Sequence, residues 1–146
     1  MKNTTIRVTL ALITTLLLLF IISCSKKEKV KPEPLESKVA TQAITTINEL
    51  KDAYESMDMS KAQKFTTNQG FKNFQDSIKE FQSVDLEFTP KWVDISDGTI
   101  KVYIAWNGTW SHSGTKSTEN GLAVFTLKGN PPVVDEILRT NPFAQH

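Results

Sequence analysis

The spacing of hydrophobic residues changes along the chain and divides it into three parts. A short polar start leads into an apolar run over residues 8–22. Residues 24–37 are charged, contain prolines and carry almost no apolar side chain. From residue 38 the apolar positions follow first a helical period and then an alternating one. We therefore expect a leader over 1–23, a charged flexible linker over 24–37 and one folded domain over 38–146.

The first half of the folded domain is predicted to be helical. Between residues 39 and 57, apolar side chains recur every three or four positions on one helix face: Ala43, Ile47, Leu50, Tyr54 and Met57. Ser60 and Gln63 have the spacing of a capping box, which predicts a short second helix that Gly70 closes. A third helix is expected over residues 71–82, with an apolar stripe of Phe71, Phe74, Ile78 and Phe81.

The second half alternates apolar and polar residues, which is the period of a β-strand. Asp97-Gly98 lies between two such runs and is typical of a type I′ hairpin turn. The expected strands cover residues 84–95, with an interruption at Pro90, then 99–112, 117–127 and 133–138. Since every connection is short, we expect an antiparallel sheet and an α+β fold in which a curved sheet wraps the helices.

The folded domain resembles the nuclear transport factor 2-like superfamily. The residues that carry this resemblance are Ile47, Leu50, Tyr54 and Asp58, then Val102, Ile104, Trp106 and Gly108, then Gly121, Ala123 and Phe125, and the terminal Asn141-Pro142-Phe143. The resemblance implies a cone of three N-terminal helices packed on a curved four-stranded antiparallel sheet, and a homodimer that forms through the sheet. These are packing and turn residues, so they indicate a fold and say little about activity.

The leader has the organisation of an export signal. Lys2 and Arg7 precede an apolar run that is shorter than the roughly 20 residues needed to cross a bilayer. The sequence Ile21-Ile22-Ser23-Cys24 resembles the lipobox of bacterial lipoproteins. This resemblance implies cleavage between Ser23 and Cys24, with a diacylglycerol on the cysteine that holds the protein on a membrane. An uncleaved membrane anchor is the alternative interpretation.

The surroundings of the cysteine bear on where the protein resides. Cys24 is the only cysteine, so no internal disulfide can form, and acylation would explain a lone thiol in an exported chain. The lysine-rich residues 26–31 form either a solvated tether or a contact for anionic lipid headgroups. Ser25 replaces the aspartate that marks inner-membrane retention in many Gram-negative lipoproteins. By this resemblance we expect the cell envelope, with the outer membrane facing the periplasm favoured over the inner membrane.

Charge and histidine content exclude several classes of function. The formal net charge is +1, and removal of the leader with its two basic residues brings it close to neutral. A near-neutral protein lacks the basic surface that nucleic-acid binding requires. The chain has two histidines, His112 and His146, whereas a zinc site needs about four ligands. No phosphate-binding glycine loop or nucleophile motif occurs, so we predict no metal and no cofactor.

Candidate acid or base residues are few. Enzymes of the resembling superfamily place such groups within the cone, and the candidates here are Tyr54, Asp94, Tyr103 and His112. None of them lies in a motif that carries over from a known enzyme, so we predict no catalytic residue. Asp94 and His112 are candidates to face each other across the first hairpin, where a surface charge pair is the alternative.

An aromatic group is the remaining candidate for a binding site. Its members are Tyr54, Trp92, Tyr103, Trp106 and Trp110. They either line a pocket for a small apolar ligand, or fill the core and support a dimer through the sheet. We therefore expect a membrane-anchored, noncatalytic module that binds a small molecule or another envelope protein. The alternative is a small cofactor-free isomerase, dehydratase or hydrolase of the same fold.

Overall fold

A computed structural model describes residues 35–144 of the chain. The predicted signal peptide, Cys24 and most of the predicted linker lie outside the described residues. The elements are α2 (Leu35–Glu55), α3 (Met59–Lys64), α4 (Asn68–Ser77), β1 (Ser83–Ser96), β2 (Thr99–His112), β3 (Thr115–Lys128) and β4 (Val133–Arg139). The predicted α+β class, with the helices preceding the strands, is confirmed.

The strands form one open antiparallel sheet in the order β1-β2-β3-β4. Two tight turns fix its register. Asp97 and Gly98 have φ values of 50° and 74°, and Ser113 and Gly114 have φ values of 49° and 80°. Positive φ at both central residues is the geometry of a type I′ turn, whose twist matches that of the flanking strands. The hairpin predicted at Asp97-Gly98 is confirmed.

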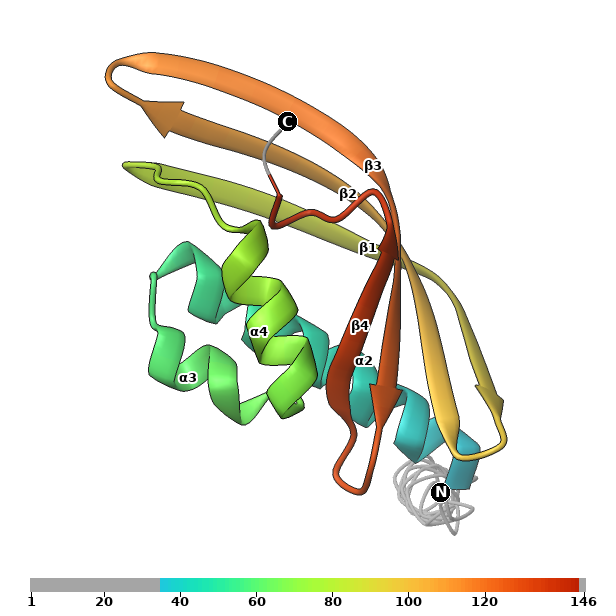
Figure 1. The fold of residues 1–146 in the computed structure, drawn as a ribbon. Coiled ribbons are helices and arrows are strands. Elements are labelled where there is room, and N and C mark those ends of the chain that lie inside the picture. The colour runs from blue at the N-terminus through green and yellow to red at the C-terminus, as the bar shows by residue number, and fades with distance from the viewer. Residues whose placement is uncertain (1–34, 145–146) are drawn as a thin grey trace, which may run out of the picture. The chain divides into compact units, whose positions relative to one another are not determined.

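The sheet is strongly bent, and the helices lie on its concave side (Figure 1). The register of β1 against β2 shifts between Pro90 and Trp92, which leaves Lys91 as the extra residue of a bulge. A bulge bends its strand and increases the local twist. The interruption predicted at Pro90 is therefore a bulge within one continuous strand. Pro90 lies in an edge strand, where a missing backbone N–H is tolerated.

The concave face carries the core. The alternating residues Ile100, Val102, Ile104 and Trp106 of β2 are all buried, as predicted from their period. The face of α2 predicted to be apolar packs against them, and its members Ala43, Ile47, Leu50 and Tyr54 are also fully buried. Each large side chain buried in this way contributes roughly 1.5 to 3 kcal/mol to stability.

Two glycines make room for the tryptophans on this face. A Cβ on Gly108 would overlap the indole of Trp110 and come within 2.7 Å of Leu86. Gly121 lies opposite Trp106 in the register, and a Cβ there would lie 3.1 Å from that indole. Gly108 thus leaves room for the indole of Trp110, and Gly121 leaves room for Thr140 and the indole of Trp106.

The helix boundaries differ from those predicted. The helix α2 begins at Leu35, so the last three residues of the predicted linker are helical. It ends before Met57, which has a φ of 54° and is 48% exposed, so the placement of Met57 on the apolar face was wrong. The N–H of Met57 donates to the carbonyl of Tyr54, and that of Asp58 donates to the carbonyl of Ala53. This pair of bonds is a Schellman motif, which normally ends on glycine.

The caps of the two shorter helices were also predicted wrongly. Asp58, rather than Ser60, caps α3 by accepting from the N–H of Lys61. Gly70 does not close that helix; it lies in the first turn of α4, which Thr67 caps. A Cβ on Gly70 would overlap the carbonyl oxygen of Val134, so this glycine permits close approach of α4 to β4. The helix then stops at Ser77, well before the predicted end.

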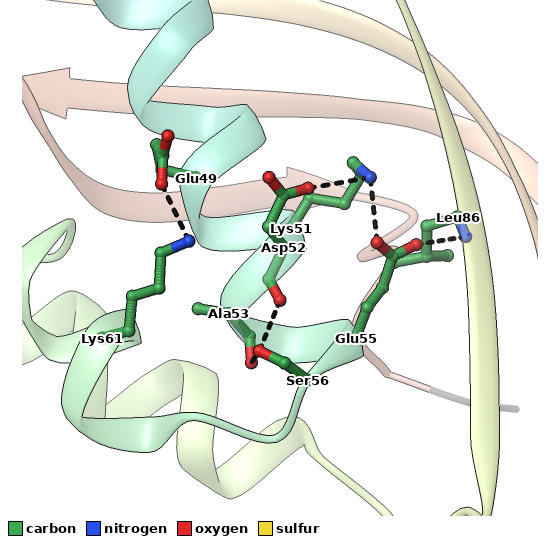
Figure 2. A network of polar contacts seen from close by, with 8 residues as sticks. All are labelled: Glu49, Lys51, Asp52, Ala53, Glu55, Ser56, Lys61 and Leu86. Atoms are coloured by element: carbon green, nitrogen blue, oxygen red, sulfur yellow. Dashed lines mark hydrogen bonds and ion pairs between the residues drawn. The ribbon is translucent and has the colours of Figure 1, made fainter.

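Both edges of the sheet are partly covered by polar contacts. On β1, the N–H of Leu86 donates to Glu55 Oε1 at 2.7 Å, while Glu55 Oε2 accepts from Lys51 Nζ at 2.9 Å (Figure 2). On β4, Val134 exchanges backbone hydrogen bonds of 2.8 Å with Phe65 and Thr67, which precede α4. These contacts satisfy edge groups that would otherwise pair with another chain.

The contact between Gly108 and the indole of Trp110 can be tested by substitution. Gly108→Ala should lower the free energy of unfolding by about 1 to 3 kcal/mol, because the new methyl group must displace a packed indole. Urea denaturation would measure the change. Asn107→Ala, at the exposed neighbouring position, is the control and should unfold at nearly the same urea concentration. Equal stability of both variants would contradict the packing described.

Candidate functional site

The five aromatic residues proposed to form one pocket are divided between the two faces of the sheet. Tyr54, Trp106 and Trp110 lie on the concave side, and each is at most 1% exposed. Trp92 and Tyr103 are opposite each other in the register of β1 and β2, and both point to the convex side. The structure therefore brings together three of the five residues on one face and two on the other.

The concave group has the contacts of a packed core. The indole N–H of Trp110 donates to the hydroxyl of Tyr54 at 3.0 Å, and that of Trp106 donates to the carbonyl of Thr140 at 2.9 Å. The two indoles meet edge to face, with ring centroids 6.2 Å apart. Both indole N–H groups thus have partners, and the rings fill the space between sheet and helix.

Tyr54 is the ionisable side chain of this group. Burial raises the pKa of Tyr54 to about 12, the hydrogen bond from Trp110 acts in the opposite direction, and the negative charge of Glu119 raises it further. The phenol is therefore protonated at neutral pH. It can serve as a hydrogen-bond partner there, but a neutral phenol with a pKa this high is a poor general base.

The other candidate acid and base pair does not form. Asp94 is paired with Lys101 near the first turn, whereas His112 ends β2 and is paired with Thr115. The expectation that Asp94 and His112 face each other was wrong. In an antiparallel hairpin, a residue beside the turn meets the start of the return strand, while His112 lies at the far end of that strand.

The described part of the chain offers little for metal binding or membrane crossing. Between residues 35 and 144, no three His, Cys, Asp or Glu side chains lie together in a way that would hold a metal ion. No helix in this range is long and apolar enough to span a bilayer.

An apolar row crosses the convex face of all four strands. Its members, in register order, are Trp92, Tyr103, Val124 and Leu138, and we name them the outer row. Trp92 is 65% exposed and Leu138 is 42% exposed, and none of the helices within residues 35–144 covers this face (Figure 1). Val124 and Leu138 were not predicted to join this group, because their place in the row depends on the register between strands.

A second apolar feature lies at the helical side of the domain, where α2 meets α3 and where α4 leads into β1. It is a hollow of about 320 Å³, which we name the helix-corner hollow. Its lining consists of Met57, Met59, Gln75, Ile78, Lys79, Glu80 and Phe81. Two methionines close together in the sequence, Met57 and Met59, could have indicated this hollow. Met57 had instead been predicted to lie on the buried face of the first helix.

Comparisons with known proteins give no relative from which a role could be transferred. A scan against protein families, a search of curated proteins and a search of solved structures each returned no match.

The hydrogen bond between Tyr54 and Trp110 leads to a prediction about stability. Tyr54→Phe should lower the free energy of unfolding by about 1 to 3 kcal/mol, because it leaves the buried indole N–H of Trp110 without an acceptor. Thermal unfolding followed by circular dichroism would measure this. Tyr103→Phe removes a hydroxyl from the convex face and should change stability by less than about 0.5 kcal/mol. A similar loss in both variants would contradict a specific role for the Tyr54 hydroxyl.

Proposed function

We propose that this protein is a lipid-anchored, noncatalytic binding module of the bacterial cell envelope, whose sheet face pairs with a second copy of the chain. The outer row is the observation that carries the binding part of the proposal. The anchor is supported by the leader and by the lipobox-like residues that end at Cys24. The tether places the folded domain at a membrane surface, where we favour the outer membrane facing the periplasm.

The outer row has the composition of a protein contact. Trp and Tyr are enriched at protein interfaces, and a large exposed side chain such as Trp92 is a typical anchor residue. Contact with a partner would remove the exposed surfaces of Trp92 and Leu138 from water. Packing of one sheet on another is a common way to cover such a face.

The charges beside the row favour a second copy as the partner. The adjacent row of the register carries Asp94 and Lys101 on neighbouring strands and Glu136 on β4. In a two-fold dimer the same patch meets itself, so a patch with both signs of charge can offer each charge an opposite partner. The patch is therefore complementary to itself, and a second copy of the chain can bind it through the same residues.

We also propose that the domain is nuclear transport factor 2-like. Three helices followed by a bent antiparallel meander support this assignment, as does burial of Trp106, Ala123 and Phe125 on the concave side. Pairing through the sheet is what the resemblance implies for such a domain.

The burial of Tyr54 favours the noncatalytic interpretation over the enzymatic alternative. An isomerase or dehydratase of this type would need an ionisable group that meets its substrate in a cavity. Tyr54 is instead covered by Trp110 and by the ring of Phe81, whose centroid is 5.0 Å away.

The anchor is tested by Cys24→Ser in the full-length chain expressed in a Gram-negative host. We expect an unprocessed precursor of higher mass that lacks the diacylglycerol, because the thiol that accepts the lipid is absent. Intact-mass spectrometry of the membrane fraction would detect both changes. Ser25→Ala is the control and should be processed normally. A wild-type protein that keeps Met1 and carries no lipid would refute the anchor.

The pairing is tested by Trp92→Ala in full-length protein purified in mild detergent. Loss of this large exposed anchor side chain should weaken the dimer about 30-fold, as measured by analytical ultracentrifugation over a concentration series. Ile95→Ala, in the same strand but outside the row, removes a partly exposed side chain and should leave the dimer intact. A monomeric wild-type protein, or equal dissociation constants for Trp92→Ala and wild type, would refute the pairing.

A further inference from the structure

The helix-corner hollow is a second site, separate in the fold from the outer row and independent of the pairing proposed above. Its apolar lining comes from Met57, Met59, Ile78 and Phe81, and its polar lining comes from Gln75, Lys79 and Glu80. We propose that this hollow binds the alkyl chain of a single-chain zwitterionic amphiphile, the chemical class that includes lysophospholipids.

The backbone at Met57 is the first observation behind this proposal. Met57 occupies the left-handed position of the Schellman motif, where a residue other than glycine is disfavoured. Burial in the core does not offset the cost of this backbone conformation, since Met57 is 48% exposed. Strained positions that the surrounding packing does not explain are concentrated at ligand sites. A ligand that covers the thioether would bury apolar surface that the domain alone leaves in water.

The lining of the hollow indicates what kind of group fits. Met59, Ile78 and Phe81 are packed against the hydrophobic core, so they form a fixed apolar wall, and Met57 is the exposed member. Methionine side chains are unbranched and adapt to irregular partners. The volume of about 320 Å³ is at the small end of ligand pockets and equals roughly ten water volumes. These properties fit one flexible alkyl chain better than a rigid ring system.

The charged residues of the lining indicate the headgroup. Lys79 and Glu80 are adjacent and exposed, and neither forms an ion pair within the described range of 35–144. A headgroup with both signs of charge can place its anionic part near the ammonium of Lys79 and its cationic part near the carboxylate of Glu80. A fatty acid would satisfy Lys79 and be repelled by Glu80. The charges therefore select a zwitterion, while the apolar wall supplies most of the affinity.

The proposal is tested by photolabelling of the full-length chain in nanodiscs of phosphatidylglycerol. The probe is dodecylphosphocholine with a diazirine at the chain end, used below its micelle-forming concentration. Tryptic peptides 52–61, 73–79 and 80–91 contain the whole lining, so label should concentrate there and be displaced by unmodified dodecylphosphocholine. Lauric acid and dodecyltrimethylammonium should compete at least about tenfold less well, and equal competition by either would overturn the zwitterionic assignment.

Substitutions at Met57 separate binding from stability. Met57→Gly should raise the unfolding temperature by about 4 °C, because it relieves the left-handed backbone, and should weaken labelling roughly tenfold. Met57→Leu keeps an apolar side chain and should retain labelling. Leu138→Ala, in the outer row, is the control and should label as wild type. Label confined to residues 1–34, or unchanged labelling of Met57→Gly, would overturn the site whether or not the chain dimerises.

Discussion

The packing of two indoles against the backbone of the sheet is the constraint on which the concave side depends. Trp106 and Trp110 can pack this closely because Gly121 and Gly108 carry no side chain beside them. Their N–H groups then reach the carbonyl of Thr140 and the hydroxyl of Tyr54. These two hydrogen bonds connect the middle of the sheet to the C-terminal segment and to α2. One pair of side chains thus contacts the sheet, the helix and the terminal segment together.

Much of the sheet could be predicted from the sequence because its signals are local. Strict alternation in β2 and the Asp97-Gly98 turn each act over a few residues, and both were read correctly. The helix ends were harder, since their caps depend on tertiary contacts. Gly70 was interpreted as a helix terminator, yet its lack of a Cβ serves the approach of α4 to Val134, far away in the sequence. No local pattern distinguishes these two uses of glycine.

The candidate sites were less predictable than the fold. The sequence indicated one group of aromatic residues, but their division between the two faces depends on the bulge at Lys91, which changes the face to which Trp92 points. Val124 and Leu138 join Trp92 and Tyr103 only through the register of the whole sheet. The helix-corner hollow was missed for a related reason, because an apolar residue at helical spacing was assumed to continue the helix. Met57 instead lies just past the end of α2.

The burial of Phe143 has a consequence for how the domain is made. This ring, near the C-terminus, is fully buried and contacts the rings of Tyr54, Phe74, Phe88 and Phe125. The centre of the aromatic cluster is therefore supplied by a segment that lies far in sequence from the helices it contacts. Without this ring, the helices and strands would lack the side chain at which they meet. A chain cut before residue 143 would therefore be expected to lose cooperativity in folding, although every helix and strand precedes the cut.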